Sequence, residues 1–333
     1  MSRHLRVLVA AVAALGLLAG CGSSNSESAS ESSNTSAVRT VATVQGEVAV
    51  PTAPKRVVVL NYALAGYAFH LGLPVTAVTA LASDQDGEPA AAWADQAKKD
   101  GTQMLRWNAQ AFNIEQITAL KPDLIIAGGW GLPFKLATDG YANLSKIAPT
   151  VLVDKALTDW REQFQFLADK ALGKPELYQD AVKAYEAKVA ETKAKITLPE
   201  LPVSYVSISG GAANPKAYVA IESTGIPKEL SAVGLTPATV FAGSGFKPYT
   251  AGGDTFNVPD EDLSRVLDQK TVFVTGFNAD NITLDQLKAR PAWASLPAFQ
   301  SGGAHLLPYW VNRADYDRSL DTLDEIAKIF PKK

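Results

Sequence analysis

Thiol and imidazole side chains are scarce in this sequence. It contains one cysteine, Cys21, and three histidines among 333 residues. A single cysteine cannot close an intrachain disulfide, and a chain of this length buries a sufficient core without one. Once Cys21 is modified, no thiol is left to act as a nucleophile or a metal ligand. A disulfide framework, cysteine catalysis and a cysteine-bound metal are therefore excluded.

Catalytic and nucleotide-binding motifs are also absent. His70 and His305 lie far apart without carboxylates at ligand spacing, and no HExxH or paired-histidine zinc pattern occurs. The glycines form no Walker loop or GxGxxG turn, and Ala242 precedes Gly243-Ser244-Gly245, so there is no GxSxG elbow. We predict that the protein is not an enzyme and binds no cofactor or metal directly. An envelope hydrolase or transferase on an α/β scaffold remains the alternative.

The sequence has no long hydrophobic run and no basic stripe. The apolar run from Val7 to Ala19 is shorter than the ~20 residues that a membrane-spanning helix needs, and no later stretch is longer. The formal net charge is −3, and lysines and arginines do not cluster as they do in nucleic-acid-binding proteins. We therefore predict no nucleic-acid partner.

The N-terminus has the pattern of an exported, lipid-anchored chain. Arg3 and Arg6 precede the apolar run, which ends in Leu18-Ala19-Gly20-Cys21 and resembles the lipobox of bacterial lipoproteins. We predict a signal peptide over 1–20, a lipid on Cys21 and a polar, flexible tether over 21–40. This places the protein in the cell envelope, on the outer face of the cytoplasmic membrane. An ordinary signal peptide with a chance cysteine is the alternative.

The residues after the tether alternate between short apolar strands and amphipathic helices. This order predicts a parallel sheet with helices on both faces. Asn61 and Asn113 are placed to cap helices, and Glu115 lies in a first turn. We expect strands at 56–60, 74–78, 123–127 and 151–153, and helices at 63–72, 113–120 and 144–147.

A long helical pattern separates this part from a second α/β part. The segment 160–172 is helical, and residues 176–195 form the longest helical pattern in the chain. We expect later strands at 203–209, 216–221, 271–275 and 305–308, and helices from 227, from 260 and over 315–330. The predicted domains are an N-terminal α/β lobe over 41–172, a connecting helix over 173–198 and a C-terminal α/β lobe over 199–333.

Five stretches carry a family resemblance: PKRVVVL at 54–60, NIEQITALKPDLIIA at 113–127, LSKIAPTV at 144–151, the segment 160–173 and PAWASLPAF at 291–299. In the same order, they resemble the binding proteins of iron-siderophore, haem and cobalamin ABC importers. They are spread over roughly 50–330. LSKIAPTV, followed by a helix that contains tryptophan, is most similar to the siderophore branch.

This resemblance implies two Rossmann-like lobes that are joined by one long helix and have a ligand cleft between them. It implies capture of a ferric siderophore and delivery to an ABC permease and its ATPase. The chelator holds the iron, so the protein needs aromatic walls and a few cations instead of metal ligands. The same scaffold carrying haem or a corrinoid is the alternative, and His305 is either a strand residue or a haem ligand.

Candidate ligand-binding residues follow the strands or lie on loops that reach the cleft, because ligands of doubly wound sheets bind at the carboxyl ends of the strands. Arg106 pairs either with an anionic ligand or with an acidic neighbour, and Trp107, Trp130 and Tyr62 are either cleft walls or packing residues. The candidates are Tyr62, Arg106, Trp107, Trp130, Lys135, Lys247, Tyr249, Phe277, Tyr309, Trp310 and Arg313.

The resemblance also implies a docking role for one acidic residue in each lobe. Glu115 and Glu261 match the positions that engage basic pockets on the two permease subunits. The alternative is that each carboxylate only stabilises the N-terminus of its own helix, by about 0.3–1 kcal/mol.

Overall fold

The computed structural model describes residues 37–332, apart from 212, 250–252, 278–280 and 314. The predicted signal peptide, Cys21 and almost all of the predicted tether lie outside the described residues. The tether was predicted to continue to residue 40, whereas a strand begins at Val38. This strand, β1 (Val38–Thr43), pairs with β2 (Gly46–Pro51) in an antiparallel hairpin that the sequence analysis did not predict. Pairing and the burial of Val41 and Val50 order this segment.

The N-terminal part is built on a parallel sheet with the strand order β5-β4-β3-β6-β7. Both faces of the sheet are covered by other parts of the chain. The side chains of the middle strand, β3, therefore point alternately into two hydrophobic cores. Val57 and Val59 belong to one hydrophobic cluster and Val58 to another. The strands are β3 (Val57–Val59), β4 (Val75–Thr79), β5 (Gln103–Leu105), β6 (Leu124–Gly128) and β7 (Thr150–Val153).

Helices cover both faces of this sheet, as predicted. The predicted caps are confirmed, since Asn61 accepts a hydrogen bond from the backbone N–H of Ala63 and Asn113 accepts one from Gln116. The helices are α1 (Tyr62–His70), η1 (Ala91–Trp93), α2 (Ala94–Asp100), α3 (Ile114–Ala119), α4 (Gly131–Asp139), α5 (Tyr141–Ile147), α6 (Trp160–Gln165) and the π-helical continuation η2 (Phe166–Ala171).

The C-terminal part contains a mixed sheet with the order β10-β9-β8-β11-β12. Strands β8, β11 and β12 are parallel, whereas β9 runs antiparallel to both of its neighbours. Residues 210–215 are too few for the crossover of about a dozen residues that parallel strands need, so β8 and β9 form a hairpin. The strands are β8 (Val203–Ser209), β9 (Lys216–Ala220), β10 (Thr255–Val258), β11 (Thr271–Gly276) and β12 (Ala304–Leu306).

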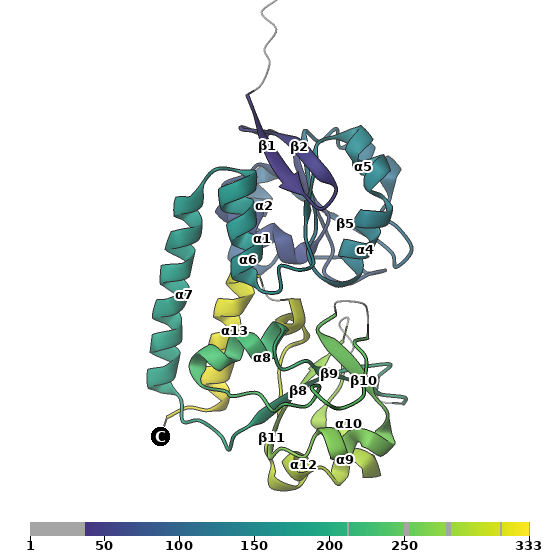
Figure 1. Ribbon diagram of the computed structural model, residues 1–333, viewed down its shortest axis with the longest axis vertical. Helices are drawn as coiled ribbons and strands as arrows, with labels where there is room; N and C mark the ends of the chain where they lie inside the picture. Colours follow the sequence, from purple (N-terminus) through teal and green to yellow (C-terminus); the bar gives the residue numbers. More distant parts are fainter. Residues whose placement is uncertain (1–36, 212, 250–252, 278–280, 314, 333) are drawn as a thin grey trace, which may run out of the picture. The chain divides into compact units, whose positions relative to one another are not determined.

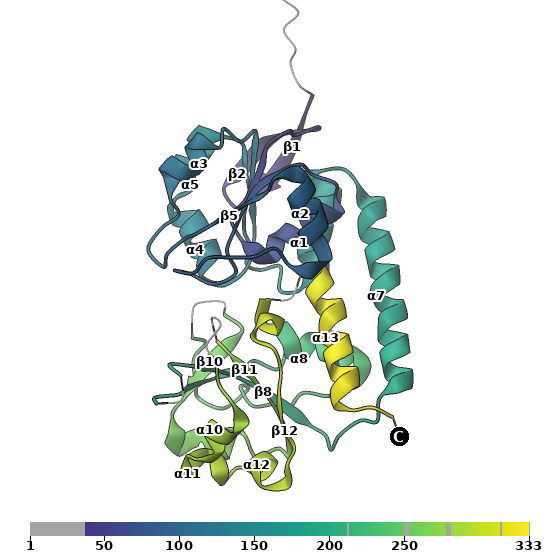
Figure 2. The same ribbon diagram turned by 180° about the vertical axis from the view of Figure 1, so that it is seen from behind.

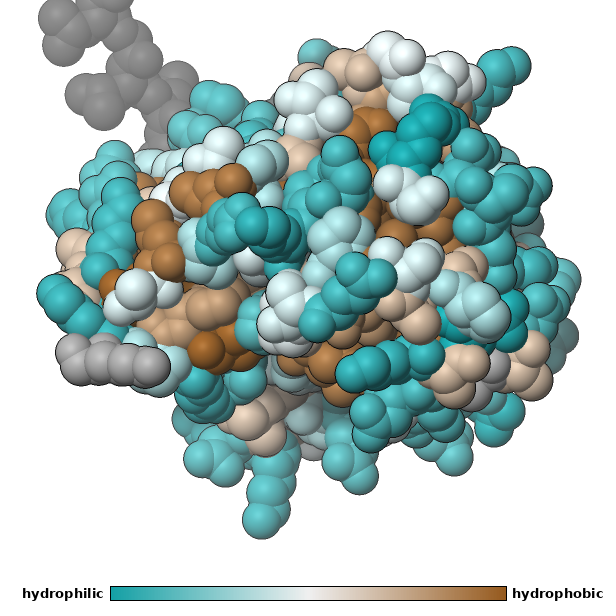
Figure 3. Space-filling view, turned by 90° about the horizontal axis from the view of Figure 1, so that it is seen from below, coloured by the Kyte–Doolittle hydropathy of each residue, from teal (hydrophilic) through white to brown (hydrophobic). Residues whose placement is uncertain are grey.

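Most of the helices in the C-terminal part are short. The helix expected from Asp260 begins with a 3-10 turn whose N-cap, Pro259, offers no side-chain hydrogen bond. Seen from below the view of Figure 1, the surface is mainly hydrophilic, with hydrophobic residues in small separate areas (Figure 3). The helices are α8 (Gly225–Leu230), η3 (Ser231–Val233), η4 (Asp260–Asp262), α9 (Leu263–Val266), α10 (Leu284–Lys288), α11 (Pro291–Ala294), α12 (Pro297–Ser301), η5 (Tyr309–Arg313) and α13 (Tyr316–Ile329).

Helix α7 (Pro175–Lys195) runs along one side of both sheets, next to α13 (Figures 1 and 2). Lys188 of α7 forms an ion pair with Asp324 of α13, with 2.5 Å between nitrogen and oxygen. Tyr185 of α7 is buried in a hydrophobic cluster that also contains Val59 of the first sheet and Phe273 of the second. The two sheets therefore share a continuous core beside α7. The boundaries predicted for the domains stay a prediction.

The first turn of α13 is buried against α1 and carries two carboxylates. Asp315, the N-cap, accepts a hydrogen bond from the backbone N–H of Arg318, and its Oδ2 atom is buried without a partner. Asp317 lies 2.8 Å from Nε2 of His70. A Cβ atom on Gly66 would lie 2.7 Å from Oδ2 of Asp315, so only glycine allows α1 to approach this closely.

Burial, together with the charge of Asp317, raises the pKa of Asp315 to about 7. Burial lowers the pKa of His70, but the hydrogen bond and charge of Asp317 outweigh it, so the net direction is upward. Both groups bind protons more strongly in the folded chain than in the unfolded one. The contribution of Asp315 to stability is therefore full below the pKa of unfolded aspartic acid, about 4, and is lost as the pH rises through about 7. The contribution of His70 is full below the pKa of unfolded histidine, about 6.5, and is lost as the pH rises through its raised pKa.

We predict that Asp315→Asn flattens this pH dependence. Asparagine keeps the helix cap but does not titrate, so the fall in unfolding free energy between about pH 5 and about pH 8 should shrink by about 2–4 kcal/mol. Urea unfolding at several pH values measures this change. Asp180→Asn, at an exposed position on α7, is the control. An unchanged slope in Asp315→Asn would contradict the assignment.

Candidate functional site

A cavity of about 240 Å³ lies between the two sheets. Trp130 and Thr158, from the loops after β6 and β7, form the wall on the first-sheet side. Ser207 near the end of β8, Thr275 near the end of β11 and Asn312 of η5 form part of the wall on the other side. The carboxyl ends of parallel strands from both sheets therefore contribute to one cavity, which is where doubly wound sheets bind ligands.

A compact hydrogen-bond network holds the second-sheet wall. The Ser207 and Thr275 hydroxyls are 2.8 Å apart, and Nδ2 of Asn312 donates to Oγ1 of Thr275 and to the carbonyl of Gly276, each at 2.9 Å. These groups satisfy one another, so the wall is polar and firmly positioned.

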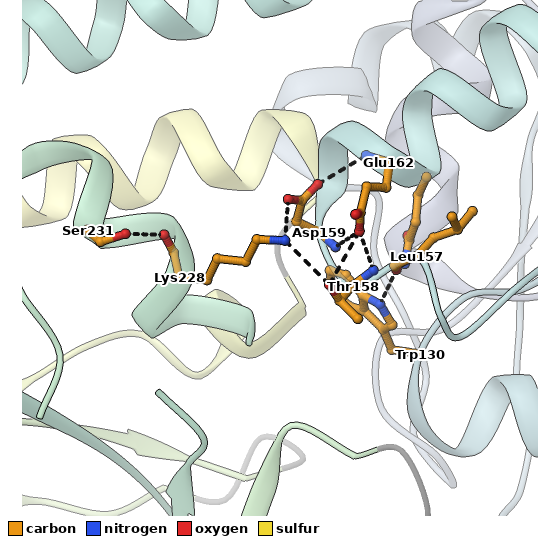
Figure 4. A network of polar contacts seen from close by, with 8 residues as sticks. Trp130, Leu157, Thr158, Asp159, Glu162, Lys228 and Ser231 are labelled. Atoms are coloured by element: carbon orange, nitrogen blue, oxygen red, sulfur yellow. Dashed lines mark hydrogen bonds and ion pairs between the residues drawn. The ribbon is translucent and has the colours of Figure 1, made fainter. Parts of the chain in front are cut away.

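A second network joins the two sides of the cavity (Figure 4). Lys228 extends from α8 to Asp159, with 2.9 Å between Nζ and Oδ2, and lies 3.4 Å from the Thr158 hydroxyl. Asp159 is also the N-cap of α6 and forms a capping box with Glu162. Burial would raise the pKa of Asp159, but hydrogen bonds from Lys228 and from the Glu162 backbone outweigh it, so the pKa is lowered.

Trp130 and Arg161 bring aromatic surface and positive charge to the cavity. Trp130 is half-buried, and its indole N–H donates to the carbonyl of Leu157 at 2.6 Å. The guanidinium of Arg161 lies over the ring of Trp160 at 4.8 Å and over that of Tyr185 at 4.4 Å. Among the predicted site residues whose side chains the structure describes, Trp130 alone lines this cavity.

Two further predicted aromatics meet a cation that the sequence analysis missed. Arg318, in the first turn of α13, lies 4.9 Å from the Trp310 ring and 5.7 Å from the Tyr62 ring. Tyr62 is buried, and its hydroxyl donates to the carbonyl of Glu88. Tyr309 lies next to Trp310 in η5. Arg313 ends the same turn, and its side chain lies outside the described part of the chain.

Tyr249 and Phe277 come together at the second sheet. Both rings contact Tyr218 of β9, with ring centroids 4.7 Å and 5.0 Å away, respectively. Tyr249 is about half exposed and therefore presents aromatic surface to solvent. Lys247 is exposed on the same loop.

Arg106 and Trp107 lie elsewhere, at a second and more open cavity of about 420 Å³ on the N-terminal part. Arg106 donates to the carbonyl of Asp84 at 2.6 Å and approaches Asp86 at 3.8 Å. Trp107 is buried, and its indole N–H donates to the carbonyl of Ala80, so it anchors its loop. The structure therefore separates this pair from Trp130 and Trp310.

The remaining predicted residues lie on exposed helix surfaces. Lys135 forms an ion pair with Asp139 on α4. Glu115 is exposed in the first turn of α3, and Glu261 is exposed in η4. Among the described residues, no cluster of histidine, cysteine, aspartate and glutamate is placed to hold a metal ion. No helix in the described ranges is long and apolar enough to cross a membrane.

The sequence patterns did not predict most of the cavity residues, because these residues lie in different helices and strands and come together only in the fold. Only Asp159 had a local signal, since Asp-x-x-Glu before a helix is typical of a capping box. Among the cavity residues that were missed are Thr158, Asp159, Arg161, Ser207, Lys228, Glu229, Thr275 and Asn312.

Comparison with known proteins identifies the family. The chain is 27% identical over 352 residues to the probable siderophore-binding lipoprotein YfiY of Bacillus subtilis, covering 100% of this chain and 99% of that protein. It is 25% identical over 299 residues to the ferric enterobactin-binding periplasmic protein FepB of Escherichia coli, covering 88% of this chain and 91% of FepB.

The fold matches solved structures. The crystal structure of Staphylococcus aureus SirA complexed with staphyloferrin B superposes with a TM-score of 0.68 at 22% identity, covering 88% of this chain and 99% of SirA. The model of the periplasmic binding protein family matches residues 57–308. The chain thus has the two-lobed fold of these binding proteins and belongs to the periplasmic binding protein family.

Proposed function

We propose that this protein is the lipid-anchored substrate-binding component of an ABC importer, which captures a ferric siderophore and delivers it to the membrane permease. Catalysis is not part of this role. The observation that carries the proposal is the cavity between the sheets, because its walls come from the carboxyl ends of strands in both lobes. The relatives named for siderophore and ferric enterobactin binding support the iron chelate as ligand.

The chemistry of the walls suits a chelate that already satisfies its iron. Trp130 and Tyr205 offer aromatic surface, and Ser207 and Asn312 offer hydrogen-bonding groups. Such groups bind the organic part of a chelate without replacing an iron ligand. Haem has no comparable support from His305, which lies in β12 and packs edge-on against Phe330, with ring centroids 4.9 Å apart.

We predict that Trp130 contributes to ligand affinity. Trp130→Ala removes an aromatic wall and should weaken ferric-chelate binding by about 1–3 kcal/mol, which is about fivefold to 150-fold. Trp130→Phe keeps a ring but loses the bond to Leu157, and it should retain most of the affinity. Titration by tryptophan fluorescence or calorimetry measures both. Full affinity in Trp130→Ala would remove Trp130 from the proposed site.

We propose that Glu115 and Glu261 dock the protein on the permease. Both carboxylates are exposed. Exposed charges at the edge of a protein–protein interface set the orientation and the association rate of the partners. Reversing both to lysine should abolish uptake of labelled iron by cells while leaving ligand affinity and melting temperature nearly unchanged. Glu176→Lys, in the first turn of α7, controls for the loss of a helix-terminal acid. A sharp fall in melting temperature would instead support the helix-stabilising alternative.

We propose that Cys21 carries the membrane anchor. In Cys21→Ala, the expressed protein should leave the membrane fraction and incorporate no labelled fatty acid, because the only thiol is gone. Detergent partitioning and fatty-acid labelling measure this. Label that persists on the variant would disprove the lipid site.

A further inference from the structure

The chain that leads from β6 into Trp130 contains two glycines in the left-handed region. Gly128 has a φ of +93° and Gly129 a φ of +76°. A Cβ atom on Gly128 would lie 2.3 Å from the carbonyl oxygen of Val153 in β7, so only glycine fits there. A glycine backbone has many conformations open to it, and this junction keeps one of them because neighbouring groups fix it. The direction in which Trp130 leaves the sheet therefore depends on the contacts of these two glycines.

The side chain of Asn61 supplies one of those contacts. Asn61 is buried just after β3, and its Nδ2 atom donates to the carbonyl of Gly128 at 2.7 Å. A Cβ atom on Gly129 would lie 2.9 Å from the same nitrogen, so the amide packs directly on this glycine as well. On the other side, the backbone N–H of Gly129 donates to the carbonyl of Val153 at 2.8 Å. Because β3 and β7 are the two neighbours of β6 in the sheet, the junction is held from both sides.

The amide of Asn61 makes two different bonds at once. Its Oδ1 atom accepts from the backbone N–H of Ala63 at 3.0 Å and caps α1, while Nδ2 donates to Gly128. Aspartate and serine cap helices about as well as asparagine does. An ionised aspartate has no donor, however, and a serine hydroxyl is one bond shorter than the amide nitrogen. Any of the three residues would serve the cap, whereas the bond to Gly128 needs the amide.

The other parts of Trp130 are anchored elsewhere. Its indole N–H donates to the carbonyl of Leu157 at 2.6 Å (Figure 4). Helix α4 begins with the next residue and buries Leu136 in the first lobe. The glycine junction is therefore the point at which the ring would tilt. Without the bond from Asn61, the buried carbonyl of Gly128 would lose this donor, which favours a shift of the junction.

We infer that Asn61 is a positioning residue for ligand binding, because its amide fixes the Gly128–Gly129 junction and so places the Trp130 ring in the cavity wall. This inference rests on the proposed function, in which Trp130 contacts the chelate. Asn61 itself is buried and is not one of the described residues that line the cavity. Its effect on a ligand therefore passes through Trp130.

A double-mutant cycle on the purified protein tests this inference, with the ferric complexes of enterobactin and staphyloferrin B as ligands. Asn61→Asp keeps the size of the side chain and the cap but loses the N–H donor. It should weaken binding about fivefold in the otherwise wild-type chain and should have no further effect beside Trp130→Ala. Asn61→Ser, which caps α1 without reaching Gly128, should behave in the same way and serves where Asn61→Asp does not fold. Asn113→Asp, at the cap of α3, is the matched control and should leave affinity unchanged.

Quenching of tryptophan fluorescence by acrylamide gives a second readout that needs no ligand. The contribution of Trp130 is the difference between chains with and without Trp130→Phe. Asn61→Asp should increase the quenching of this contribution, because the ring is held less firmly, and Asn113→Asp should not.

The outcomes separate this inference from the proposed function. Unchanged affinity in Asn61→Asp overturns the positioning role, as does the same fold loss with and without Trp130, because a merely structural residue acts independently of the ring. Unchanged quenching of Trp130 overturns it as well. Binding of neither complex, nor of any wider panel of ferric chelates, overturns the proposed function, and the quenching result then decides by itself whether Asn61 positions Trp130.

Discussion

The arrangement of the molecule depends on one hydrophobic core that both sheets share. Val59 of the first sheet and Phe273 of the second belong to the same buried cluster, together with Tyr185 of α7 and Leu323 of α13. Removing this apolar area from water holds the two halves together on one side. The cavity then forms beside that core, where the carboxyl ends of the strands meet. Its walls are positioned because the core behind them cannot shift without losing contact.

Polar groups are concentrated where this core meets the cavity. Asp159 caps α6 and at the same time binds Lys228 from α8, so one carboxylate orders a helix of the first lobe and connects it to the second. Asp315 plays a comparable part at α13, where its cap places Arg318 beside Trp310 and Tyr62. The side chains that we propose to face a ligand are thus held by the same bonds that begin the helices.

Much of the fold could be predicted from local patterns, because buried parallel strands and helix caps leave short-range signals. The runs around Val58 and Ile125 and the caps at Asn61 and Asn113 are of this kind. The strand β9 was predicted, but its antiparallel direction was not, and the β1–β2 hairpin was missed, because pairing is decided by connection length and partner strands. The cavity was harder, since Lys228 and Asp159 meet only through tertiary packing. For Trp107 the sequence pattern was ambiguous, because a tryptophan after a strand can be a cleft wall or a loop anchor. In the structure its indole N–H donates to the carbonyl of Ala80 and anchors the loop.

The composition of α7 has a consequence for how quickly a ligand is captured. The helix contains no glycine, and its only proline, Pro175, is in the first turn, where it does not interrupt the backbone hydrogen bonds. Because α7 has no kink site and packs on α13 and on the shared core, the lobes have little freedom to open and close. The ligand therefore meets a preorganised surface, and binding sacrifices little conformational entropy of the protein. Under these conditions the association rate is governed by encounter and orientation, and differences in affinity between chelates arise mainly in how slowly each one leaves.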